Sequence, residues 1–323
     1  MSKVSTHKRL HIIGAGMAGM IAAHAFRSYS PVILEAQNGL PHNHEAILRF
    51  RSELVSDICG IAFRPVTVRK SIYTGGQYVD RADPQLANMY SRKVVRQVVD
   101  RSIWNLEPCV RYIAPPYLPE GLAARLDISY GTPIQSVASL LDYTRLGPVV
   151  STIPMPLMMK LIGWSDLPEF TAYPIWSVQV DFTTPQIDVH QTIYFPDPDT
   201  DYYRASLTGR RLIVEFVREP GSNFADHIAD IVKIFGLDPA LYVPGMPKLH
   251  RLGKIAPIDD DLRREFIYTL TREYGVYSLG RFATWQPLLL DDIVGDCDVI
   301  ERLIGGESRR SRYQQSLASV RNA

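Results

Sequence analysis

Three glycines near the N-terminus have the spacing of a turn that binds the pyrophosphate of a dinucleotide. Gly14, Gly16 and Gly19 form the pattern GxGxxG. In such a turn the first glycine permits the tight bend, the second lets the backbone approach the pyrophosphate, and the third allows a helix to pack closely on a sheet. The pattern alone is weak, because a glycine-rich turn also arises by chance, so the residues around it decide its meaning.

Two neighbouring features favour the dinucleotide site. Met17 and Ala18 begin a segment rich in Ala and Met, whose first helical turn offers backbone N–H donors and the positive end of the helix dipole. Glu35 follows Gly16 by 19 residues, at the end of the next apolar segment, where a carboxylate binds ribose hydroxyls. The same carboxylate disfavours NADP, because it would repel a ribose 2′-phosphate.

The elements that must position these residues form a parallel βαβ unit. Residues 10–13 and 31–34 are short apolar strands, and residues 17–27 between them have the composition of a helix. Further along, residues 146–153 predict a turn and a buried strand, and residues 154–162 predict the helix that follows it. This alternation of strands and helices predicts an α/β nucleotide domain.

The middle of the chain changes to a β pattern. Residues 173–217 contain short alternating runs separated by turns such as DPDTD and TGRR, which predicts a meandering antiparallel sheet. Elsewhere the sequence predicts helices over residues 45–56, 83–99, 224–235 and 291–304, a strand-like segment over 267–279, and a loosely ordered polar tail over 309–323.

Three separate segments resemble one family of flavoproteins. The chain opens on HIIGAGMAGMIAAHAFRSYSPVILEAQ, which resembles the opening of the FAD superfamily that contains amine oxidases, protoporphyrinogen oxidase and UDP-galactopyranose mutase. The middle segment is GPVVSTIPMPLMMKLIG, which is similar to the strand and helix that return to the nucleotide domain in that superfamily. The third is SLGRFATWQPLLLDDIVGD, which is similar to the C-terminal Gly-Arg stretch of the mutases.

The resemblance implies FAD as the cofactor, held by residues from both ends of the chain. The three glycines of the turn would hold its pyrophosphate, and Glu35 the adenosine ribose. Gly280 and Arg281 would lie beside the isoalloxazine ring, with Asp291 near the ribityl or phosphate oxygens. An NAD-only dehydrogenase would not need this C-terminal return, which favours FAD over NAD.

The fold implied is an FAD/NAD(P)-binding Rossmann-like α/β domain with an inserted antiparallel-sheet substrate lobe. The discontinuous FAD-binding domain is predicted to comprise residues 1–75, 125–165 and 250–308, and the substrate lobe residues 76–124 and 166–249. One departure from the family concerns the arginine of an Arg-x-Gly-Gly pattern that usually follows the acidic residue. This chain has PHNHEAILRFR there, and His44, Arg49 or Arg51 are the candidates to replace that arginine.

Two basic residues are the candidates for roles in catalysis. Arg204, between aromatic residues on a predicted strand, could anchor a substrate carboxylate or phosphate, or could be an exposed strand arginine. Lys254, in LGKIAPID, lies where the resemblance to amine oxidases suggests a lysine that orders water over the flavin, with a solvated loop lysine as the alternative. Trp285 could wall the flavin pocket or belong to a core.

The substrate is left open between several classes. A flavin in this setting most often takes a hydride from a carbon beside nitrogen, which favours an amine or amino-acid oxidase. A narrower resemblance, of NHEAILRFRSELVSDICGIAFRPVTVRK and YSLGRFATWQP, is to bacteriophage flavoenzymes of thymidine hypermodification. Those enzymes oxidise a glycine on the thymine methyl group of DNA, releasing glyoxylate and leaving 5-aminomethyl-deoxyuridine. The alternatives are a sugar-nucleotide mutase that uses reduced flavin, a free amine or amino-acid oxidase, and a flavin-bound protein without catalysis.

Composition sets the remaining expectations for partners and compartment. The net charge of +1 neither favours nor excludes nucleic acid, although two stretches, residues 92–101 and 309–312, are locally basic. The three cysteines lie far apart with no CxxC pair, which predicts reduced thiols, no zinc site and a cytoplasmic protein. His42 and His44 lack companion ligands, so we expect no metal there, and no apolar run predicts a membrane span.

Overall fold

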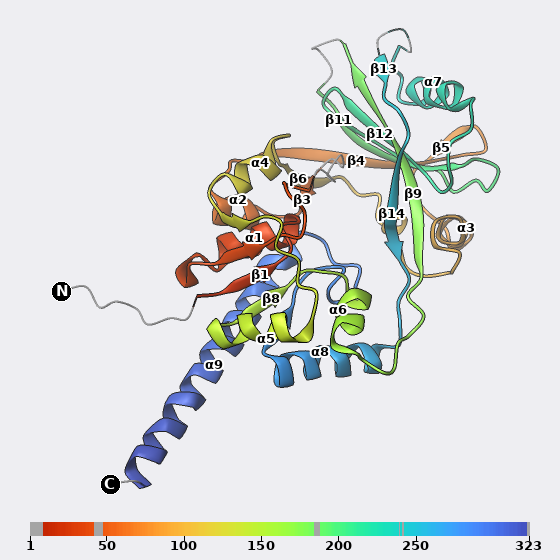
Figure 1. Ribbon diagram of the computed structural model, residues 1–323. Coiled ribbons are helices and arrows are strands. Elements are labelled where there is room, and N and C mark those ends of the chain that lie inside the picture. Colours follow the sequence, from red (N-terminus) through yellow and green to blue (C-terminus); the bar gives the residue numbers. More distant parts are fainter. Residues whose placement is uncertain (1–8, 42–47, 184–187, 239, 241, 322–323) are drawn as a thin grey trace.

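The structure is a computed structural model that describes residues 9–41, 48–183, 188–238, 240 and 242–321, with the backbone alone for 307–321. Two sheets dominate it, a parallel sheet of five strands and a mixed sheet of ten (Figure 1). In Figure 1 the parallel sheet and its helices lie at the lower left and the large sheet at the upper right. This arrangement confirms the predicted combination of a Rossmann-like α/β half with a second, sheet-based half.

The five-stranded sheet has the order β15-β8-β1-β2-β7, with all neighbouring strands parallel. Each strand is a short run of three residues, and most of these side chains are buried, as expected for a parallel sheet covered on both faces. The strands are β1 (His11–Ile13), β2 (Val32–Leu34), β7 (Asp127–Ser129), β8 (Val149–Ser151) and β15 (Val276–Ser278).

Helices cover both faces of this sheet. On one face Ile12 and Val150 pack with α1 (Met17–Ala25), α2 (Leu54–Cys59), α4 (Leu118–Ala123) and α9 (Asp292–Arg321). On the other face the adjacent residues Ile13 and Val149 pack with α5 (Val137–Leu146), α6 (Met155–Ile162) and α8 (Asp260–Tyr274). Because alternate residues of a strand point to opposite faces, the two cores are separate layers.

The large sheet has the order β13-β9-β12-β11-β10-β4-β6-β3, with β14 also paired to β9 and β5 to β4. Its pairings are antiparallel except for β10 and β4, which run parallel. The strands are β3 (Arg49–Phe50), β4 (Arg64–Thr74), β5 (Gln77–Val79), β6 (Cys109–Ile113), β9 (Ala172–Phe182), β10 (His190–Tyr194), β11 (Tyr202–Thr208), β12 (Arg211–Phe216), β13 (Tyr242–Pro244) and β14 (Lys248–Ile255).

The two faces of this sheet differ in chemistry. One face is apolar, with Ala205, Leu207 and Val214 packed under α7 (Phe224–Ile234). The alternate residues of β11, Arg204, Ser206 and Thr208, point to the other face. Part of that face is covered by α3 (Pro84–Val95).

Several predicted elements differ from the structure. The strand-like segment over 267–279 is wrong, because α8 continues to Tyr274 and only Val276–Ser278 form a strand. The side chain of Asp259 caps the start of α8 and Gly275, with a φ of 68°, ends it, so capping overrode the β-branched and aromatic composition. The predicted helix over 45–56 is wrong for residues 48–53, which include β3, and is confirmed for residues 54–56, which begin α2.

Two helix ends also differ from the expectation. The helix predicted over 83–99 stops at Val95, because Arg96 adopts the left-handed conformation with a φ of 57°. The helix predicted over 291–304 extends into the polar tail, since the backbone of α9 continues to Arg321 and runs out from the body (Figure 1). The division of the chain at residues 75 and 250 remains a prediction. It assigns all of β4 and most of β14 to the FAD-binding domain, although both strands hydrogen-bond to strands of the large sheet.

Candidate cofactor and substrate site

The glycine turn between β1 and α1 is built around Gly14 and Gly19. Gly14 has a φ of 102°, and a Cβ on Gly19 would lie 2.0 Å from the carbonyl oxygen of Gly14. Thr152 braces the turn from β8, donating its hydroxyl to the carbonyl of Ile13 at 2.9 Å. A Cβ on Gly16, in contrast, would meet no atom within 4 Å. Two of the glycines are therefore required by the fold itself, whereas Gly16 borders open space at the start of α1.

Glu35 ties the end of β2 to this turn. Its carboxylate is 6% exposed and accepts the amide of Ala15 at 2.7 Å through one oxygen and the amide of Gln37 at 2.9 Å through the other. Each carboxylate oxygen can accept more than one hydrogen bond, so acceptor capacity remains for ribose hydroxyls. The N-cap of α1, Gly16, makes no side-chain cap, and the first turn of the helix carries no acidic residue.

The C-terminal loop returns to the same helix. Gly280 has a φ of 86°, and a Cβ on it would lie 3.1 Å from the Cβ of Ala18 and 3.2 Å from Cδ1 of Ile293. The amide of Leu279 donates to the carbonyl of Ser151 at 2.9 Å, which fixes the loop to the end of β8. The structure thus brings together Gly280, the glycine turn and the first turn of α1, as the sequence predicts.

Asp291 has a different set of partners from those expected. Its carboxylate accepts the amides of Arg51 at 2.7 Å and Ser52 at 3.2 Å, and its side chain is 8% exposed. The guanidinium of Arg51 pairs with Asp291 and Asp292. Asp291 therefore joins the segment after β3 to the start of α9, and its contact with a cofactor remains a prediction.

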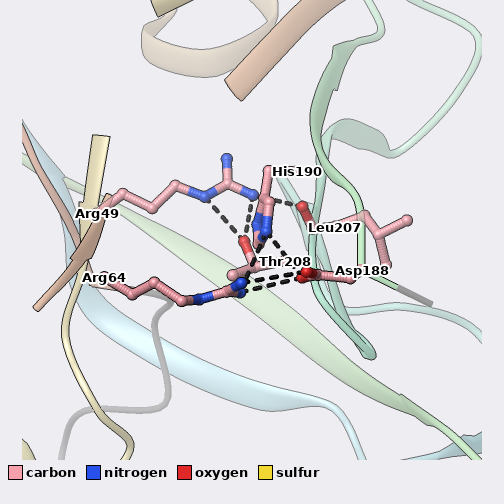
Figure 2. A network of polar contacts seen from close by, with 6 residues as sticks. All are labelled: Arg49, Arg64, Asp188, His190, Leu207 and Thr208. Carbon is pink, nitrogen blue, oxygen red and sulfur yellow. Dashed lines mark hydrogen bonds and ion pairs between the residues drawn. The ribbon is translucent and has the colours of Figure 1, made fainter. Parts of the chain in front are cut away.

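Arg49 lies on β3, an end strand of the large sheet, and bonds to β10 and β11 of the same sheet. Its guanidinium donates to the hydroxyl of Thr208 at 2.8 Å, to the hydroxyl of Thr192 at 2.8 Å and to the carbonyl of Leu207 at 2.6 Å. Figure 2 shows Arg49 and Arg64 reaching from the same side toward this part of the sheet. Burial lowers the pKa of Arg49 to about 10. With its guanidinium so engaged, Arg49 is no candidate for the missing Arg-x-Gly-Gly arginine; His44 lies outside the described residues.

Arg204 lies on the polar face of the large sheet, where it pairs with Glu215 on the neighbouring strand. Its Nη2 donates to Oε1 of Glu215 at 2.8 Å, its Nε pairs with Oε2, and Tyr203 donates its hydroxyl to the same carboxylate at 2.9 Å. Burial alone would raise the pKa of Glu215, but Arg204 dominates and holds it at about 2. Two of the guanidinium nitrogens are therefore used within the sheet, so Arg204 is better suited to positioning Glu215 than to gripping a substrate carboxylate.

Lys254 is presented to the same cluster by an irregularity in β14. The pairing of β14 with β9 shifts between His250 and Lys254, and a Cβ on Gly253 would lie 2.4 Å from Cγ1 of Ile175. Such a bulge redirects a side chain. The Nζ of Lys254 lies 5.8 Å from the ring centroid of Tyr203. Burial, together with nearby arginines, lowers the pKa of Lys254 from 10.5 to about 7.

Arg281 connects the C-terminal loop to this cluster. Its Nη2 donates to the carbonyl of Gly253 at 3.1 Å, next to Lys254. The structure thus brings together Arg281, Lys254 and Arg204, which come from three distant parts of the sequence. Arg101, which the sequence placed in a basic stretch, also belongs here, with its guanidinium 5.8 Å from the ring centroid of Tyr90. No local pattern marks Arg101 or Glu215, since only the folded sheet brings them to the site.

Other predicted features have structural roles. Trp285 belongs to the core, 3% exposed, with its indole N–H donating to the carbonyl of Ala256 at 2.9 Å. Lys93 of the basic stretch is turned inward, where its ammonium donates to the carbonyls of Phe195, Asp197 and Tyr202 and to the hydroxyl of Thr200 at 2.7–3.0 Å. The side chains of Arg309, Arg310 and Arg312 lie outside the description.

Among the described residues there is neither a helix that could span a membrane nor a cluster of metal ligands. None of the helices described is both long and apolar enough to cross a bilayer. Within the same residues we found no group of three or more His, Cys, Asp or Glu side chains placed to hold a metal ion. His42 and His44 lie outside the residues that were searched.

Comparison with known proteins gave matches at the level of structure. No protein-family model and no curated protein sequence matches the chain. Reduced UDP-galactopyranose mutase aligns with a TM-score of 0.61 and 13% identity, covering 92% of this chain and 96% of the mutase. An oxidoreductase from Methanosarcina mazei aligns with a TM-score of 0.52 and 9% identity, covering 91% of this chain and all of that one.

A third match was solved with its cofactor. Aklavinone-11 hydroxylase, in a ternary complex with FAD and aklavinone, aligns with a TM-score of 0.52 and 14% identity. The alignment covers 91% of this chain and 61% of the hydroxylase, so the chain spans less than two thirds of that protein. The chain therefore has the fold shared by the mutase and by this FAD-containing hydroxylase.

Proposed function

We propose that this protein is an FAD-dependent oxidoreductase that oxidises the C–N bond of an amine or amino-acid group. The observation that carries the proposal is the return of the loop at Gly280 to the glycine turn, with Arg281 of the same loop bonded beside Lys254 on the polar sheet. The glycine turn and a cluster of ionisable groups thus lie on either side of one loop, which supports a cofactor site beside a substrate site. The fold shared with an FAD-containing hydroxylase supports the choice of cofactor.

The residues fit the ADP part of FAD. Open space at Gly16 leaves the backbone amides at the start of α1 accessible to a pyrophosphate, and Glu35 retains acceptor capacity for ribose hydroxyls. Gly280 and Arg281 would lie along the flavin end, with Met17 and Ala18 in the first helical turn. When bound, FAD supplies the acceptor for a hydride from the carbon that bears the amine.

Lys254 has the properties of a group that accepts the proton lost by the substrate amine. An amine must lose its proton before its C–H bond is oxidised, and a lysine with a pKa of about 7 is partly neutral at physiological pH. Arg204 and Glu215 fix the electrostatics around it, because their ion pair is rigid within the sheet. The polar face is thus suited to orienting a polar substrate.

The visible spectrum of the purified protein tests the cofactor. We expect a yellow protein that releases FAD on denaturation, and stoichiometric NAD without flavin would contradict the proposal. Anaerobic mixing then tests the reaction, because an amine oxidase bleaches its flavin with substrate alone. A flavin that stays oxidised with every amine, amino acid and modified DNA supplied would contradict C–N oxidation.

A finer hypothesis names the substrate as a glycine attached to the thymine methyl group in phage DNA. It rests on the resemblance to the hypermodification flavoenzymes and on the basic residues of 92–101 and 309–312, and it implies action in the host cytoplasm. Each phosphate contact lowers log affinity by about 0.7–0.9 per log unit of salt. Turnover on modified DNA should therefore fall steeply with salt, and charge reversal at Arg309 and Arg310 should flatten that dependence. Efficient, salt-independent oxidation of free glycine would contradict it.

A second candidate is a mutase that uses reduced flavin, favoured by the alignment with reduced UDP-galactopyranose mutase over 92% of this chain. The requirement for a reductant distinguishes the two. A mutase is inactive until its flavin is reduced from outside, whereas an amine oxidase reduces the flavin with its own substrate.

A further inference from the structure

Two buried donors near the C-terminal loop lack a hydrogen-bond acceptor. The Nε atoms of Arg101 and Arg281 are both inaccessible to solvent, and no residue in the described part of the chain accepts from either. Buried polar groups in folded proteins are nearly always paired, so two orphaned guanidinium N–H groups in one region call for an explanation. Arg281 donates to the carbonyl of Gly253, beside Lys254. Arg101 lies over the ring of Tyr90, which packs against Tyr203 with ring centroids 6.2 Å apart, and the Lys254 ammonium lies over the Tyr203 ring. The two arginines and Lys254 therefore belong to one cluster.

The charges of this cluster are unbalanced. Arg101, Arg204 and Arg281 are cationic, Lys254 is partly so because its pKa is about 7, and Glu215 is the carboxylate that interacts with Lys254. Arg204 already uses both oxygens of Glu215. Cations gathered in a region of low dielectric repel one another unless an anion joins them. The excess positive charge therefore points to an anionic ligand.

Neighbouring buried cations show that the excess is particular to this cluster. Lys93 has four acceptors within 3.0 Å, and Arg49 has hydroxyl and carbonyl partners on two strands. For Lys254 no hydrogen bond to a described residue is found, and its ammonium faces the ring of Tyr203 instead. The fold can thus satisfy buried cations elsewhere, whereas at Arg101, Lys254 and Arg281 it leaves donors without an acceptor among the described residues.

We propose that Arg101, Lys254 and Arg281 form a subsite for a phosphoryl group carried by the substrate. The three donors come from the start of η2 (Ser102–Trp104), from β14 and from the C-terminal loop, so they approach from separate elements. A tetrahedral phosphoryl group offers three oxygens to separate donors, whereas a carboxylate offers two in one plane. The substrate class of the proposed oxidoreductase is then a phosphate-bearing amine; this identification rests on the proposed function.

Calorimetric titration with inorganic phosphate tests the subsite directly. The protein is saturated with FAD, kept oxidised, and titrated at low ionic strength. We expect phosphate to bind, and Arg101→Met and Arg281→Met each to weaken binding by about 10- to 100-fold, the effect of losing one hydrogen bond between charged groups. Arg92→Met is the matched control, because Arg92 is an exposed arginine on α3 that lines a different pocket, and it should leave binding unchanged.

Melting temperatures distinguish a ligand site from a structural role. Because Arg101→Met removes an unpaired buried donor, we expect its melting temperature without phosphate to stay the same or rise. Absence of phosphate binding, acetate binding as tight as phosphate, or equal losses in Arg92→Met would each overturn the subsite. These measurements involve no turnover, so phosphate binding in a protein whose flavin no amine bleaches would refute the proposed function and leave the subsite standing.

Discussion

Gly280 lies against Ala18, so close that a Cβ on the glycine would stand 3.1 Å from the Cβ of the alanine. The two residues are separated by most of the chain, yet Ala18 lies in the first turn of α1 and Gly280 lies in the loop after β15. A φ of 86° at Gly280 adds a conformation that L-residues rarely adopt. The close approach and the backbone angle together explain why a glycine stands where the two ends of the chain meet.

Substitution of Gly16 should affect FAD binding, whereas substitution of Gly19 should affect folding. Gly16→Val introduces a side chain into open space, so we expect a normal melting temperature but no measurable FAD binding. Gly19→Val would force atoms against the carbonyl of Gly14, with a destabilisation of about 1–3 kcal/mol or more. Thermal unfolding and FAD titration of both variants check this. Retention of FAD by folded Gly16→Val would show that the cofactor lies elsewhere.

Glu35→Gln should weaken FAD with little change of fold. The amide keeps one acceptor oxygen for the backbone but loses the charge and an acceptor site, so we expect a loss of about 1–3 kcal/mol in binding. Flavin fluorescence titration measures the dissociation constant. If it does not change, another residue binds the ribose. Glu53→Gln, on an exposed residue at the N-cap of α2, is a control.

Lys254 should impose a pH dependence on flavin reduction. Its pKa is lowered from 10.5 to about 7 by burial and by Arg204, so the neutral amine appears as the pH rises through 7. We expect the rate of anaerobic flavin reduction by substrate to rise over that range and the inflection to vanish in Lys254→Met. An inflection near 7 that persists in Lys254→Met would assign the proton to another group.

The lowered pKa of Lys254 also makes the stability of the protein depend on pH. The folded protein binds the lysine proton less tightly than the unfolded chain, so stability should increase as the pH rises from about 7 toward 10.5. Below pH 7 the penalty of the buried charge is fully present. Lys254→Met should therefore be more stable than the wild type at pH 6, with the difference shrinking toward pH 10. Denaturant unfolding across this range measures it.

Arg49 and Arg64 provide a matched pair within the network of Figure 2. Arg49→Met removes a buried guanidinium that bonds Thr192 and Thr208, so we expect a loss of roughly 1.5–3 kcal/mol in unfolding free energy. Arg64→Met removes an ion pair with Asp188 in which both side chains are more than half exposed, with an expected effect of about 0–1 kcal/mol. Equal effects in urea unfolding would contradict this difference.

The nucleotide half was the most predictable part of the fold from sequence. The residues of the glycine turn and Glu35 are close in sequence, and their spacing alone specifies strand, turn, helix and strand. The loop at Gly280 required a family resemblance, because its contact with Ala18 depends on packing between distant segments. Local spacing cannot reveal such a contact.

The candidate substrate site was predicted only in part. Arg204 was identified between aromatic residues, and Lys254 through the resemblance to amine oxidases. The partner of Arg204, however, lies on the next strand and is fixed by register. Arg101 follows a helix that stops earlier than its sequence suggests, because Arg96 turns left-handed at its end. Cross-strand pairing and helix termination therefore decide which charges meet, and neither leaves a pattern in the sequence.

The contrast between the two faces of the large sheet allows stability and activity to vary separately. Substitutions under α7, at positions such as Leu207 or Val214, should reduce the fraction of folded molecules while each folded molecule keeps its turnover rate. Substitutions on the polar face should instead lower the turnover rate of each folded molecule and change the fraction of folded molecules less. Selection for a new substrate can therefore change one side of a strand while alternate residues of the same strand preserve the fold.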